Sequence, residues 1–197
     1  MKAIVIFHSV CGNTYLMARN IYYNLRKNGA DVEIFRVKDD DLVELSKKFP
    51  VVNDYLEEIV QVPIVSLDKV LESDYIFLGC PTYFGNVSAE MKAFMDSFSP
   101  LWKDASLFGK RLIAFTSCGN SEGSGDVCLK AINTFGQHLG MMSVPVPANL
   151  DNIKSSPAYG LIHYSGDMGD KRINEEEKKF IEEFIQLIIN KSRVKAL

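Results

Sequence analysis

The sequence predicts an α/β fold in which a doubly wound parallel sheet is covered by helices on both faces. Short, continuous apolar runs alternate along the chain with amphipathic segments of helical length. Uninterrupted apolar runs are typical of strands that are buried on both faces, as in parallel sheets. Strands that alternate with helices predict βαβ units. Because no repeat, low-complexity tract or linker divides the 197 residues, we expect one domain over residues 1–197.

Five runs have strand character. Four of them are rich in β-branched or aromatic residues and are too short for independent helices. In the fifth run, Pro145 indicates a strand end or a sheet edge. The long polar stretch from about 147 to 173 is predicted to be a connection. The predicted strands are 3–7 (AIVIF), 32–37 (VEIFRV), 75–80 (YIFLGC), 111–117 (RLIAFTS) and 141–146 (MMSVPV).

Helical spacing of apolar residues predicts the segments that cover this sheet. A segment after the first strand carries Met17, Ile21 and Leu25 and stops at Gly29. Two further helices are predicted within residues 88–98, where Ser88 caps the start, and 126–140. A last helix follows Asn174, which forms a capping-box pattern with Glu177. Residues 39–62 are predicted to form short acidic helical or irregular pieces.

Composition excludes several classes of protein. A net charge of -3 offers no electrostatic footprint for nucleic acid. No apolar run approaches the roughly 18 residues of a membrane span, and the N-terminus does not resemble a signal peptide. The cysteines have no C-x-x-C spacing, and without a secretion signal we expect reduced thiols in the cytoplasm. Because the histidines are scattered, we expect no metal site, and residues 39–41 (DDD) are predicted to form a solvated turn. The cysteines are Cys11, Cys80, Cys118 and Cys128, and the histidines are His8, His138 and His163.

Loops that follow the predicted strands form the candidate site, because open parallel sheets bind ligands beyond the carboxyl ends of their strands. The first is 8–14 (HSVCGNT), in which Gly12 allows a tight turn just before a helix. Helix N-termini with small polar side chains favour phosphate, although a capped helix start without a ligand is the alternative. The spacing matches neither a Walker loop nor G-x-G-x-x-G, and the lack of Lys and Arg suggests neutral donors.

Two further loops suit a flat ring. Residues 81–86 (PTYFGN) place two aromatic side chains next to Gly and Asn, and the alternative is that these aromatics fold into the core. Residues 118–126 (CGNSEGSGD) offer backbone donors, and the alternative there is a plain connector. Together the three loops satisfy the needs of a mononucleotide such as FMN, with one loop for the phosphate and two for the ring system.

These loops, the pair Leu101–Trp102 and the late YG…GD pattern resemble the flavodoxin-like NAD(P)H:quinone oxidoreductases of the WrbA family. The resemblance runs almost end to end and is most specific over residues 78–115. It implies a flavodoxin-like five-stranded sheet of order 2-1-3-4-5, non-covalent FMN, and NADH or NADPH as electron donor. A quinone or similar small molecule would be the acceptor. The resemblance also implies a homo-oligomer, a dimer or a tetramer, in which neighbouring subunits complete each active site.

The resemblance assigns roles residue by residue. The phosphate would be bound by Ser9, Cys11, Gly12, Asn13 and Thr14. The isoalloxazine would be held by Pro81, Thr82, Tyr83, Phe84, Gly85 and Asn86, and closed from the other side by Ser117, Cys118, Gly119, Asn120 and Gly123. Trp102 and His138 would line the substrate pocket, with Trp102 facing the flavin of a neighbouring subunit. Tyr83 stands where the family often has Arg, and Leu139 replaces the second of two family histidines.

Two functions from different classes fit these residues. The first is an FMN-dependent enzyme, in which the flavin carries the chemistry and no side chain need act as acid or base. The second is a flavodoxin-type electron carrier that docks redox partners and has no small-molecule substrate. Near-neutral charge and the long 147–173 stretch favour the enzyme. A receiver domain is excluded because His8 and Ser9 stand where its acidic pair belongs.

The thiols give one more expectation. Cys11, Cys80 and Cys118 each follow or end a different strand, so all three should approach the same end of the sheet. A redox-sensitive thiol beside the flavin is one interpretation, and simple replacement of another small residue is the other. A helix N-terminus lowers a thiol pKa and a nearby phosphate raises it, and we expect Cys11 to remain protonated when FMN is bound.

Overall fold

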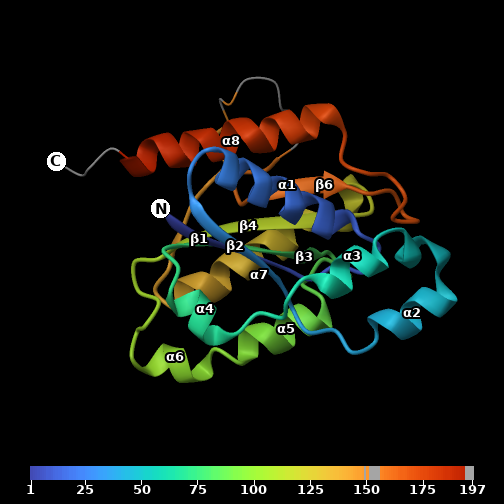
Figure 1. Ribbon diagram of the computed structural model, residues 1–197, viewed down its shortest axis with the longest axis horizontal. Coiled ribbons are helices and arrows are strands. Elements are labelled where there is room, and N and C mark those ends of the chain that lie inside the picture. The colour runs from blue at the N-terminus through green and yellow to red at the C-terminus, as the bar shows by residue number, and fades with distance from the viewer. Residues whose placement is uncertain (149, 151–155, 194–197) are drawn as a thin grey trace.

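The computed structural model describes residues 1–148, 150 and 156–193. Its centre is a six-stranded sheet with the order β2-β1-β3-β4-β5, in which β6 also pairs with β4 (Figure 1). All the pairings are parallel. The predicted order and the doubly wound class are therefore confirmed. The strands are β1 (Lys2–Phe7), β2 (Asp31–Arg36), β3 (Tyr75–Pro81), β4 (Arg111–Cys118), β5 (Met142–Ser143) and β6 (Leu161–Tyr164).

Alternate residues of the central strands enter two separate cores. Along β3, Tyr75 and Phe77 face one apolar cluster, whereas Ile76 and Leu78 face the other. A parallel strand buried on both faces has no polar side to present, which explains its uninterrupted apolar sequence. Gly79 lies between Phe7 and Phe115 in register, and a methyl group there would overlap the Phe115 ring. The glycine therefore leaves room for a phenylalanine on the neighbouring strand.

Two long helices cover the first face, above the sheet in Figure 1. They are α1 (Asn13–Lys27) and α8 (Glu175–Arg193), which pack against each other as well as against the sheet. The start of α8 is the predicted capping box: the Asn174 Oδ1 accepts from the Glu177 N–H at 2.9 Å, and the Glu177 Oε2 accepts from the Asn174 N–H at 2.8 Å.

Shorter helices cover the opposite face. Ser88 caps the helix that begins at Ala89, as predicted, because its Oγ accepts from the Met91 N–H at 3.3 Å. The helices on this face are α4 (Leu67–Leu71), α5 (Ala89–Asp96), α6 (Ser99–Lys103) and α7 (Gly125–His138), seen below the sheet in Figure 1.

The acidic stretch after β2 folds as short helical pieces. These are α2 (Leu42–Lys48), the 3₁₀ turn η1 (Pro50–Asp54) and α3 (Leu56–Gln61). A further 3₁₀ turn, η2 (Ser121–Gly123), follows β4. The predicted solvated turn is wrong in one place, because the Asp39 side chain is only 4% exposed. Its carboxylate is buried by a contact with His8 that no local pattern could indicate.

The prediction for residues 141–173 needs two corrections. Only Met142 and Ser143 of the fifth apolar run are strand, where they pair with the start of β4. The expected polar connection contains β6, which pairs with the end of β4 from Phe115 to Cys118. The two short strands thus pair with different halves of one neighbour. The prediction failed because β6 is only four residues long and contains His163, so its apolar pattern is weak.

Candidate functional site

The first loop makes the tight turn that the sequence predicts. Gly12 adopts φ 87°, the left-handed region that favours glycine, and is followed at once by α1. A methyl group at this position would also overlap the ring of Tyr55. Both the backbone angle and the close ring therefore require glycine here, and the first amides of α1 have no partner within the helix.

Ser9 carries the most informative atom of the loop. Its side chain is buried, and its Oγ has no hydrogen-bond partner among the described residues. Leaving a buried hydroxyl unsatisfied costs on the order of 1–3 kcal/mol. An anion at the helix N-terminus would accept this hydrogen bond. The orphan hydroxyl on a left-handed glycine turn therefore fits the phosphate of FMN.

Asn13 is placed differently from the prediction of a free phosphate donor. Its Nδ2 donates to the Gly169 carbonyl at 2.7 Å, and its Oδ1 accepts from Arg172 at 3.0 Å. Arg172 also donates to the Cys11 carbonyl at 2.7 Å and forms an ion pair with Asp54. One amide proton of Asn13 remains for a ligand. Its other interactions hold a late loop, residues 165–172, against the phosphate loop.

Arg172 is a site residue that the sequence prediction missed. Its guanidinium lies 5.1 Å from the centre of the Tyr55 ring and therefore joins the late loop to the segment after η1. The late YG…GD pattern indicated this loop but not the arginine that follows it. Local sequence could not have paired Arg172 with Cys11, which lies 161 positions away.

Thr14 and Ser117 join two of the three predicted loops. The Thr14 Oγ1 and the Ser117 Oγ are 2.8 Å apart, and both side chains are buried. Ser117 therefore lies beside the phosphate loop, and its contact with the ring stays a prediction. Because only one of the two protons is used between these hydroxyls, the other remains available to an oxygen of a ligand.

The loop after β3 forms a tight two-residue turn. The backbones of Tyr83 and Asn86 exchange hydrogen bonds of 2.9 and 3.0 Å around Phe84 and Gly85. Phe84 has φ 51°, a left-handed value that is unfavourable for a bulky residue, and its side chain is fully exposed at 108% of the reference area. Tyr83 is 42% exposed. These aromatic side chains therefore do not fold into the core. Both lie at the carboxyl ends of the strands, where the phosphate loop also lies.

A chain of hydrogen bonds lies beneath this turn. The Thr82 Oγ1 is 2.8 Å from the Thr116 Oγ1, which donates to the Cys80 carbonyl at 2.7 Å. Cys80 is fully buried, with its Sγ 3.9 Å from that of Cys128. The thiol of Cys80 therefore points into the core and not toward a ligand, although it ends a strand as expected. Burial raises the pKa of the Cys80 thiol well above its usual value.

The loop after β4 is tied to the late loop. Asn120 donates to Asp167 at 2.8 Å, and a methyl group on Gly119 would come within 3.0 Å of the same carboxylate. A methyl group on Gly123 would overlap the Cys118 sulfur. The predicted ring-closing amide of Asn120 is therefore engaged with the protein, and the two glycines allow the loops to approach each other closely.

Cys11 and Tyr83 have raised pKa values at this end of the sheet. Burial raises the pKa of Cys11, and the nearby Arg172 opposes that effect. Burial, with the acidic groups of Cys11, Glu90 and Asp39 around it, raises the pKa of Tyr83. Both groups are therefore protonated at neutral pH, which agrees in direction with the expectation for Cys11.

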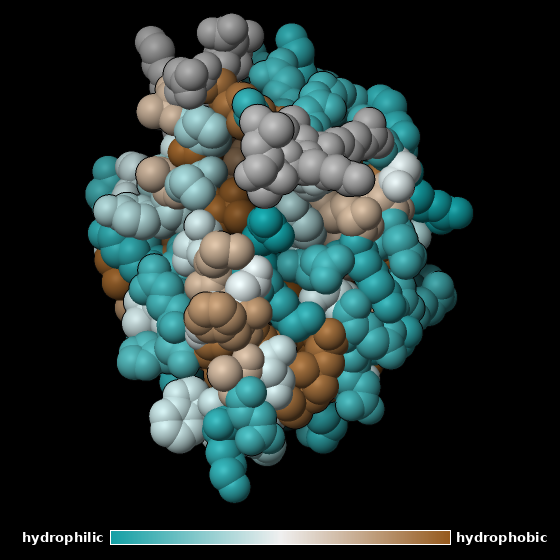
Figure 2. Space-filling view, turned by 90° about the vertical axis from the view of Figure 1, so that its left-hand side faces the viewer, coloured by the Kyte–Doolittle hydropathy of each residue, from teal (hydrophilic) through white to brown (hydrophobic). Residues whose placement is uncertain are grey.

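Trp102 and His138 line one shallow groove of about 210 Å³ between α6 and the end of α7, together with Phe98 and Phe135. Trp102 is 65% exposed. Because α7 starts after β4 and ends where β5 begins, this groove lies toward the amino ends of the strands, away from the three loops. Figure 2 faces this end of the molecule and shows apolar side chains gathered down the middle of the face, with polar side chains on both sides.

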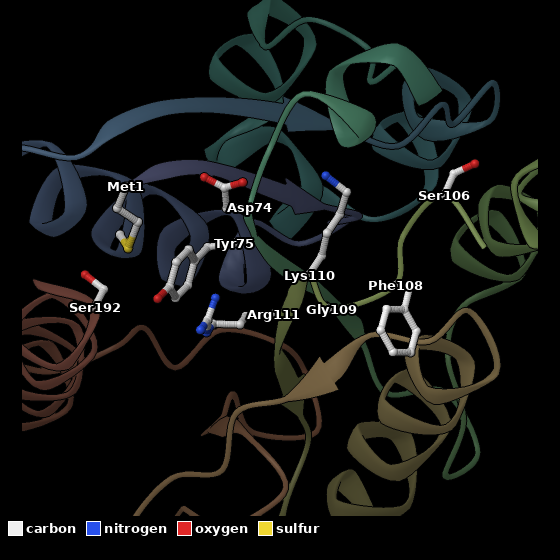
Figure 3. Close-up of a pocket in the computed structure, with 9 residues that line it drawn as sticks. All are labelled: Met1, Asp74, Tyr75, Ser106, Phe108, Gly109, Lys110, Arg111 and Ser192. Carbon is white, nitrogen blue, oxygen red and sulfur yellow. The ribbon is translucent and has the colours of Figure 1, made fainter. Parts of the chain in front are cut away.

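A larger groove of about 560 Å³ also lies at the amino ends of the strands (Figure 3). Its basic side chains are engaged with the protein. Lys110 donates to the carbonyls of Leu71 and Ser73 at 2.8 and 2.7 Å, and Arg111 lies 5.1 Å from the Tyr75 ring centre. Burial lowers the pKa of Lys110. Its size alone therefore does not make this groove a better candidate than the three loops.

Comparisons with known proteins show the family of the chain. A family model described as NADPH-dependent FMN reductase matches residues 1–154. An NAD(P)H dehydrogenase (quinone) of Methanosarcina barkeri is 30% identical over 188 residues, which cover 90% of each chain. A protein of the same description from Caulobacter vibrioides is 30% identical over 182 residues, 89% of each chain.

Solved structures show the same fold. A flavodoxin, WrbA-like protein from Agrobacterium tumefaciens superposes with a TM-score of 0.68 at 16% identity, covering 98% of this chain and 97% of that one. A Fusobacterium nucleatum flavodoxin bound to flavin mononucleotide gives a TM-score of 0.62 at 14% identity, covering 96% and 98%. At these identities the likeness concerns the fold alone.

Proposed function

The chain belongs to the NADPH-dependent FMN reductase family, and on that premise we propose that it is an FMN-dependent oxidoreductase. Two electrons pass from NADH or NADPH to a quinone or a similar small acceptor. The observation that carries the proposal is the buried, unpartnered Ser9 hydroxyl on the Gly12 turn, beside the exposed aromatic turn of Tyr83 and Phe84. That arrangement supports a phosphate site and a ring site at one end of the sheet.

The side chains bind and position the cofactor. The phosphate would be held by Ser9, by the first amides of α1, and by the hydroxyl proton that the Thr14–Ser117 hydrogen bond leaves free. Tyr83, Phe84 and the backbone of Gly119 would flank the isoalloxazine. FMN, when bound, supplies the hydride-accepting and hydride-donating chemistry, which the protein orients. The late loop, held by Arg172, would exclude water from the phosphate side.

Trp102 and His138 would line the substrate pocket of a neighbouring subunit and not that of their own chain. In their own chain they lie toward the opposite end of the sheet from the FMN loops, so they can reach a flavin only in an oligomer. The exposed Trp102 ring and the groove it shares with His138 support a dimer or tetramer that pairs the two ends of different subunits. A cytoplasmic location is proposed from the four free thiols.

Subunit complementation tests this arrangement. One variant carries Trp102→Ala and the other carries Ser9→Ala with Gly12→Val, which removes FMN binding. Mixing and reassembly should restore part of the NADPH:quinone activity, because some sites then combine an intact flavin with an intact Trp102. Sedimentation velocity reports the oligomer. A monomer under assay conditions, or mixtures no more active than their parents, would contradict the shared site.

An electron carrier is the alternative function, since several structural neighbours are flavodoxins. The two functions differ in their response to a nicotinamide. The protein is purified, loaded with FMN, and mixed with NADPH in the absence of oxygen. Complete and rapid loss of the oxidised flavin absorbance, reversed by a quinone, supports the enzyme. Flavin that NADH and NADPH leave oxidised, but that a redox protein reduces, supports the carrier.

A further inference from the structure

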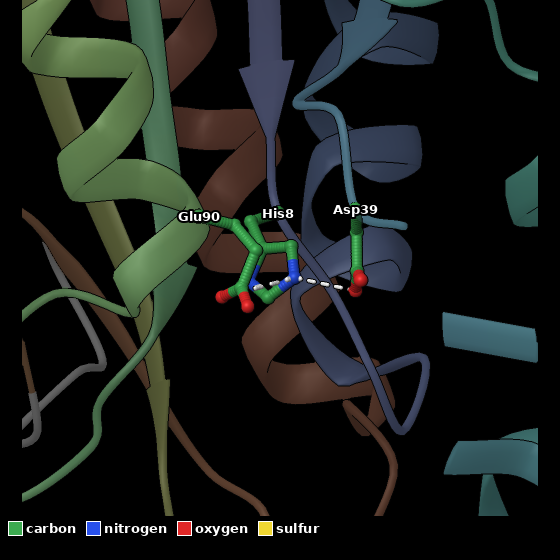
Figure 4. Close-up of side chains that lie close together, drawn as sticks. All are labelled: His8, Asp39 and Glu90. Carbon is green, nitrogen blue, oxygen red and sulfur yellow. Dashed lines mark hydrogen bonds and ion pairs between the residues drawn. The ribbon is translucent and has the colours of Figure 1, made fainter. Parts of the chain in front are cut away.

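A histidine and two carboxylates, none of them among the proposed FMN contacts, converge on one point beside Tyr83. His8 follows β1 and is 2% exposed. Its Nε2 is 3.0 Å from the Asp39 Oδ2 and 3.7 Å from the Glu90 Oε2. Figure 4 shows the two carboxylates approaching the ring from different elements, Glu90 from α5 and Asp39 from the segment after β2. No local sequence pattern indicates this convergence, because His8 and Glu90 are 82 positions apart.

From this geometry we propose that His8, Asp39 and Glu90 form a binding site for a divalent transition cation of the zinc or manganese class. Such cations take imidazole nitrogen and carboxylate oxygen at about 2.0–2.2 Å. Two bonds of that length, at tetrahedral or octahedral angles, place ligand atoms roughly 3.0–3.5 Å apart. The His8–Asp39 separation of 3.0 Å falls in this range, and the His8–Glu90 separation of 3.7 Å lies just above it. Because the three ligand atoms lie within 4.8 Å of one another, a cation can be enclosed if the partly exposed Glu90 side chain moves inward.

Outer contacts orient the ligand atoms toward the shared point. The His8 Nδ1 is 2.8 Å from the Ser88 Oγ. A proton on Nδ1 can therefore be donated to Ser88, which leaves the Nε2 lone pair free for a metal. The Asp39 Oδ1 accepts from the Asp41 N–H at 2.9 Å, and Oδ2 is thereby directed at His8. Hydrogen bonds that fix the second atom of each ligand are typical of metal sites.

The charge of the cluster favours a cation. Asp39 has a side chain that is 4% exposed, and Glu90 adds a second carboxylate at 29% exposure. Burying a carboxylate costs free energy unless the carboxylate is paired. A single proton on the His8 Nε2 cannot hydrogen-bond equally well to the Asp39 Oδ2 and the Glu90 Oε2. A divalent ion would neutralise both carboxylates and replace that proton. Three protein ligands would leave positions open for water or another donor.

The cluster has a route to solvent. A groove of about 520 Å³ beside it is lined by Asp39, Asp40, Asp41 and Glu90, with Lys38 as its basic residue. Lys38 is paired with Asp40 at 2.6 Å. The excess of negative charge would attract cations to this mouth. Glu90, being partly exposed, is the ligand through which an ion would enter.

Manganese binding tests the site directly. The FMN-loaded protein is treated with a chelator, desalted and titrated with Mn²⁺, and the free ion is measured by electron paramagnetic resonance. We expect one saturable Mn²⁺ per chain, displaced by Zn²⁺. Glu90→Gln should weaken Mn²⁺ at least about tenfold, which is the lower end of what metal-site partners contribute. Asp39→Asn, a second ligand variant, should do the same.

The matched control is Asp40→Asn. It removes one negative charge from the same groove but no ligand atom, so we expect Mn²⁺ affinity to change less than about threefold, as for a screened surface charge. Equal weakening by Asp40→Asn and Glu90→Gln would mean diffuse attraction and would overturn the site. So would the absence of saturable binding, or binding that disappears in the FMN-free protein and therefore belongs to the phosphate. Circular dichroism melting establishes that each variant is folded.

Discussion

At the amino ends of the strands, Lys110 donates to two backbone carbonyls and Arg111 lies over the ring of Tyr75. At the carboxyl ends, the buried Ser9 hydroxyl has no partner among the described residues, and Phe84 holds a left-handed backbone with a fully exposed ring. The first end has the 560 Å³ groove, whose basic side chains are engaged, although the buried Ser143 Oγ there also lacks a partner in the described part of the chain and Ala105 has φ 49°. The second end combines an orphan hydroxyl with a helix N-terminus and an exposed aromatic turn, which together suit a phosphate and a ring. This combination of groups therefore indicates the site better than volume or a single orphan group does.

The largest effect is expected from removing phosphate donors at the carboxyl end. Ser9→Ala combined with Thr14→Ala should weaken FMN binding by roughly 2–6 kcal/mol, at 1–3 kcal/mol for each lost charge-assisted bond. The affinity is measured by flavin fluorescence quenching. Ser106→Ala, which removes a hydroxyl from the amino-end groove, is the control and should leave FMN affinity unchanged. Unchanged FMN affinity in the double variant would remove the phosphate assignment.

Two left-handed glycines provide a matched pair. Gly12→Ala adds backbone strain and overlap with Tyr55, so we expect a loss of about 2–4 kcal/mol in unfolding free energy and much weaker FMN binding. Gly109, at the amino end, has φ 79° but nothing within 4 Å of an added methyl group. Gly109→Ala should cost only about 1 kcal/mol and spare FMN. Urea denaturation measures both, and equal losses would show that Tyr55 yields to the methyl group.

A pH-dependent contact should stabilise the late loop near the carboxyl end. The His163 Nδ1 is 2.7 Å from Glu177, and its Nε2 is 2.9 Å from the Lys171 carbonyl. Burial would raise the pKa of Glu177, but hydrogen bonds from His163 and from the Asn174 backbone outweigh it and lower that pKa. A lowered folded-state pKa gives stability that is present above the unfolded value of about 4.5 and is lost as the pH falls through the folded value.

Glu177→Gln should therefore reduce the unfolding free energy by about 1–2 kcal/mol at pH 7. This is below the full range of about 1.5–3 kcal/mol for hydrogen bonds to charged groups, because solvent screens the partly exposed carboxylate. Wild type and variant should converge as the pH falls through the lowered folded-state pKa of Glu177. Chemical denaturation at a series of pH values makes the comparison. A constant difference across the series would show that Glu177 contributes by packing and not through its charge.

Phe84 tests whether strain at the carboxyl end serves binding. Phe84→Gly should relieve the left-handed strain and leave stability unchanged or raised by about 0.5–1 kcal/mol. FMN affinity or NADPH oxidation should fall in the same variant, because an aromatic wall of the ring site is lost. Thermal melting and FMN titration are read together. A variant that binds FMN and reacts like wild type would show that Phe84 has another role.

The smallest effect concerns the Cys11 thiol. FMN should slow alkylation of Cys11 several-fold without changing its protonation, because the cofactor covers a thiol that burial already keeps protonated. Mass spectrometry of peptides from the holoprotein and the apoprotein measures the two rates. Cys128, which is fully buried, is the internal reference. Equal labelling of Cys11 in both forms would place it away from the phosphate.

Sequence predicted the parts of this molecule that depend on local patterns. The apolar runs of β1, β3 and β4, the Gly12 turn and the Asn174–Glu177 cap all follow from nearby residues. Contacts between distant segments were missed, since no local pattern carries them. Arg172 reaches Cys11, Asp39 is buried by His8, and the short β6 completes the edge of the sheet beside β4.

The site predictions show the same division. The loops after β1, β3 and β4 were identified correctly as neighbours at one end of the sheet. The detailed use of their side chains was not predictable, because Asn13 and Asn120 bind a late loop whose position depends on tertiary packing. Whether Trp102 reaches a flavin depends on a second subunit, and that contact stays a prediction.

Hydrogen–deuterium exchange with and without FMN tests the contrast between the two ends most directly. We expect slower exchange on FMN addition in residues 9–14, 82–86, 117–123 and 165–172, with residues 106–111 at the amino end unchanged. Slower exchange in residues 106–111 alone, or no change in residues 9–14, would contradict the placement of the cofactor at the carboxyl ends of the strands.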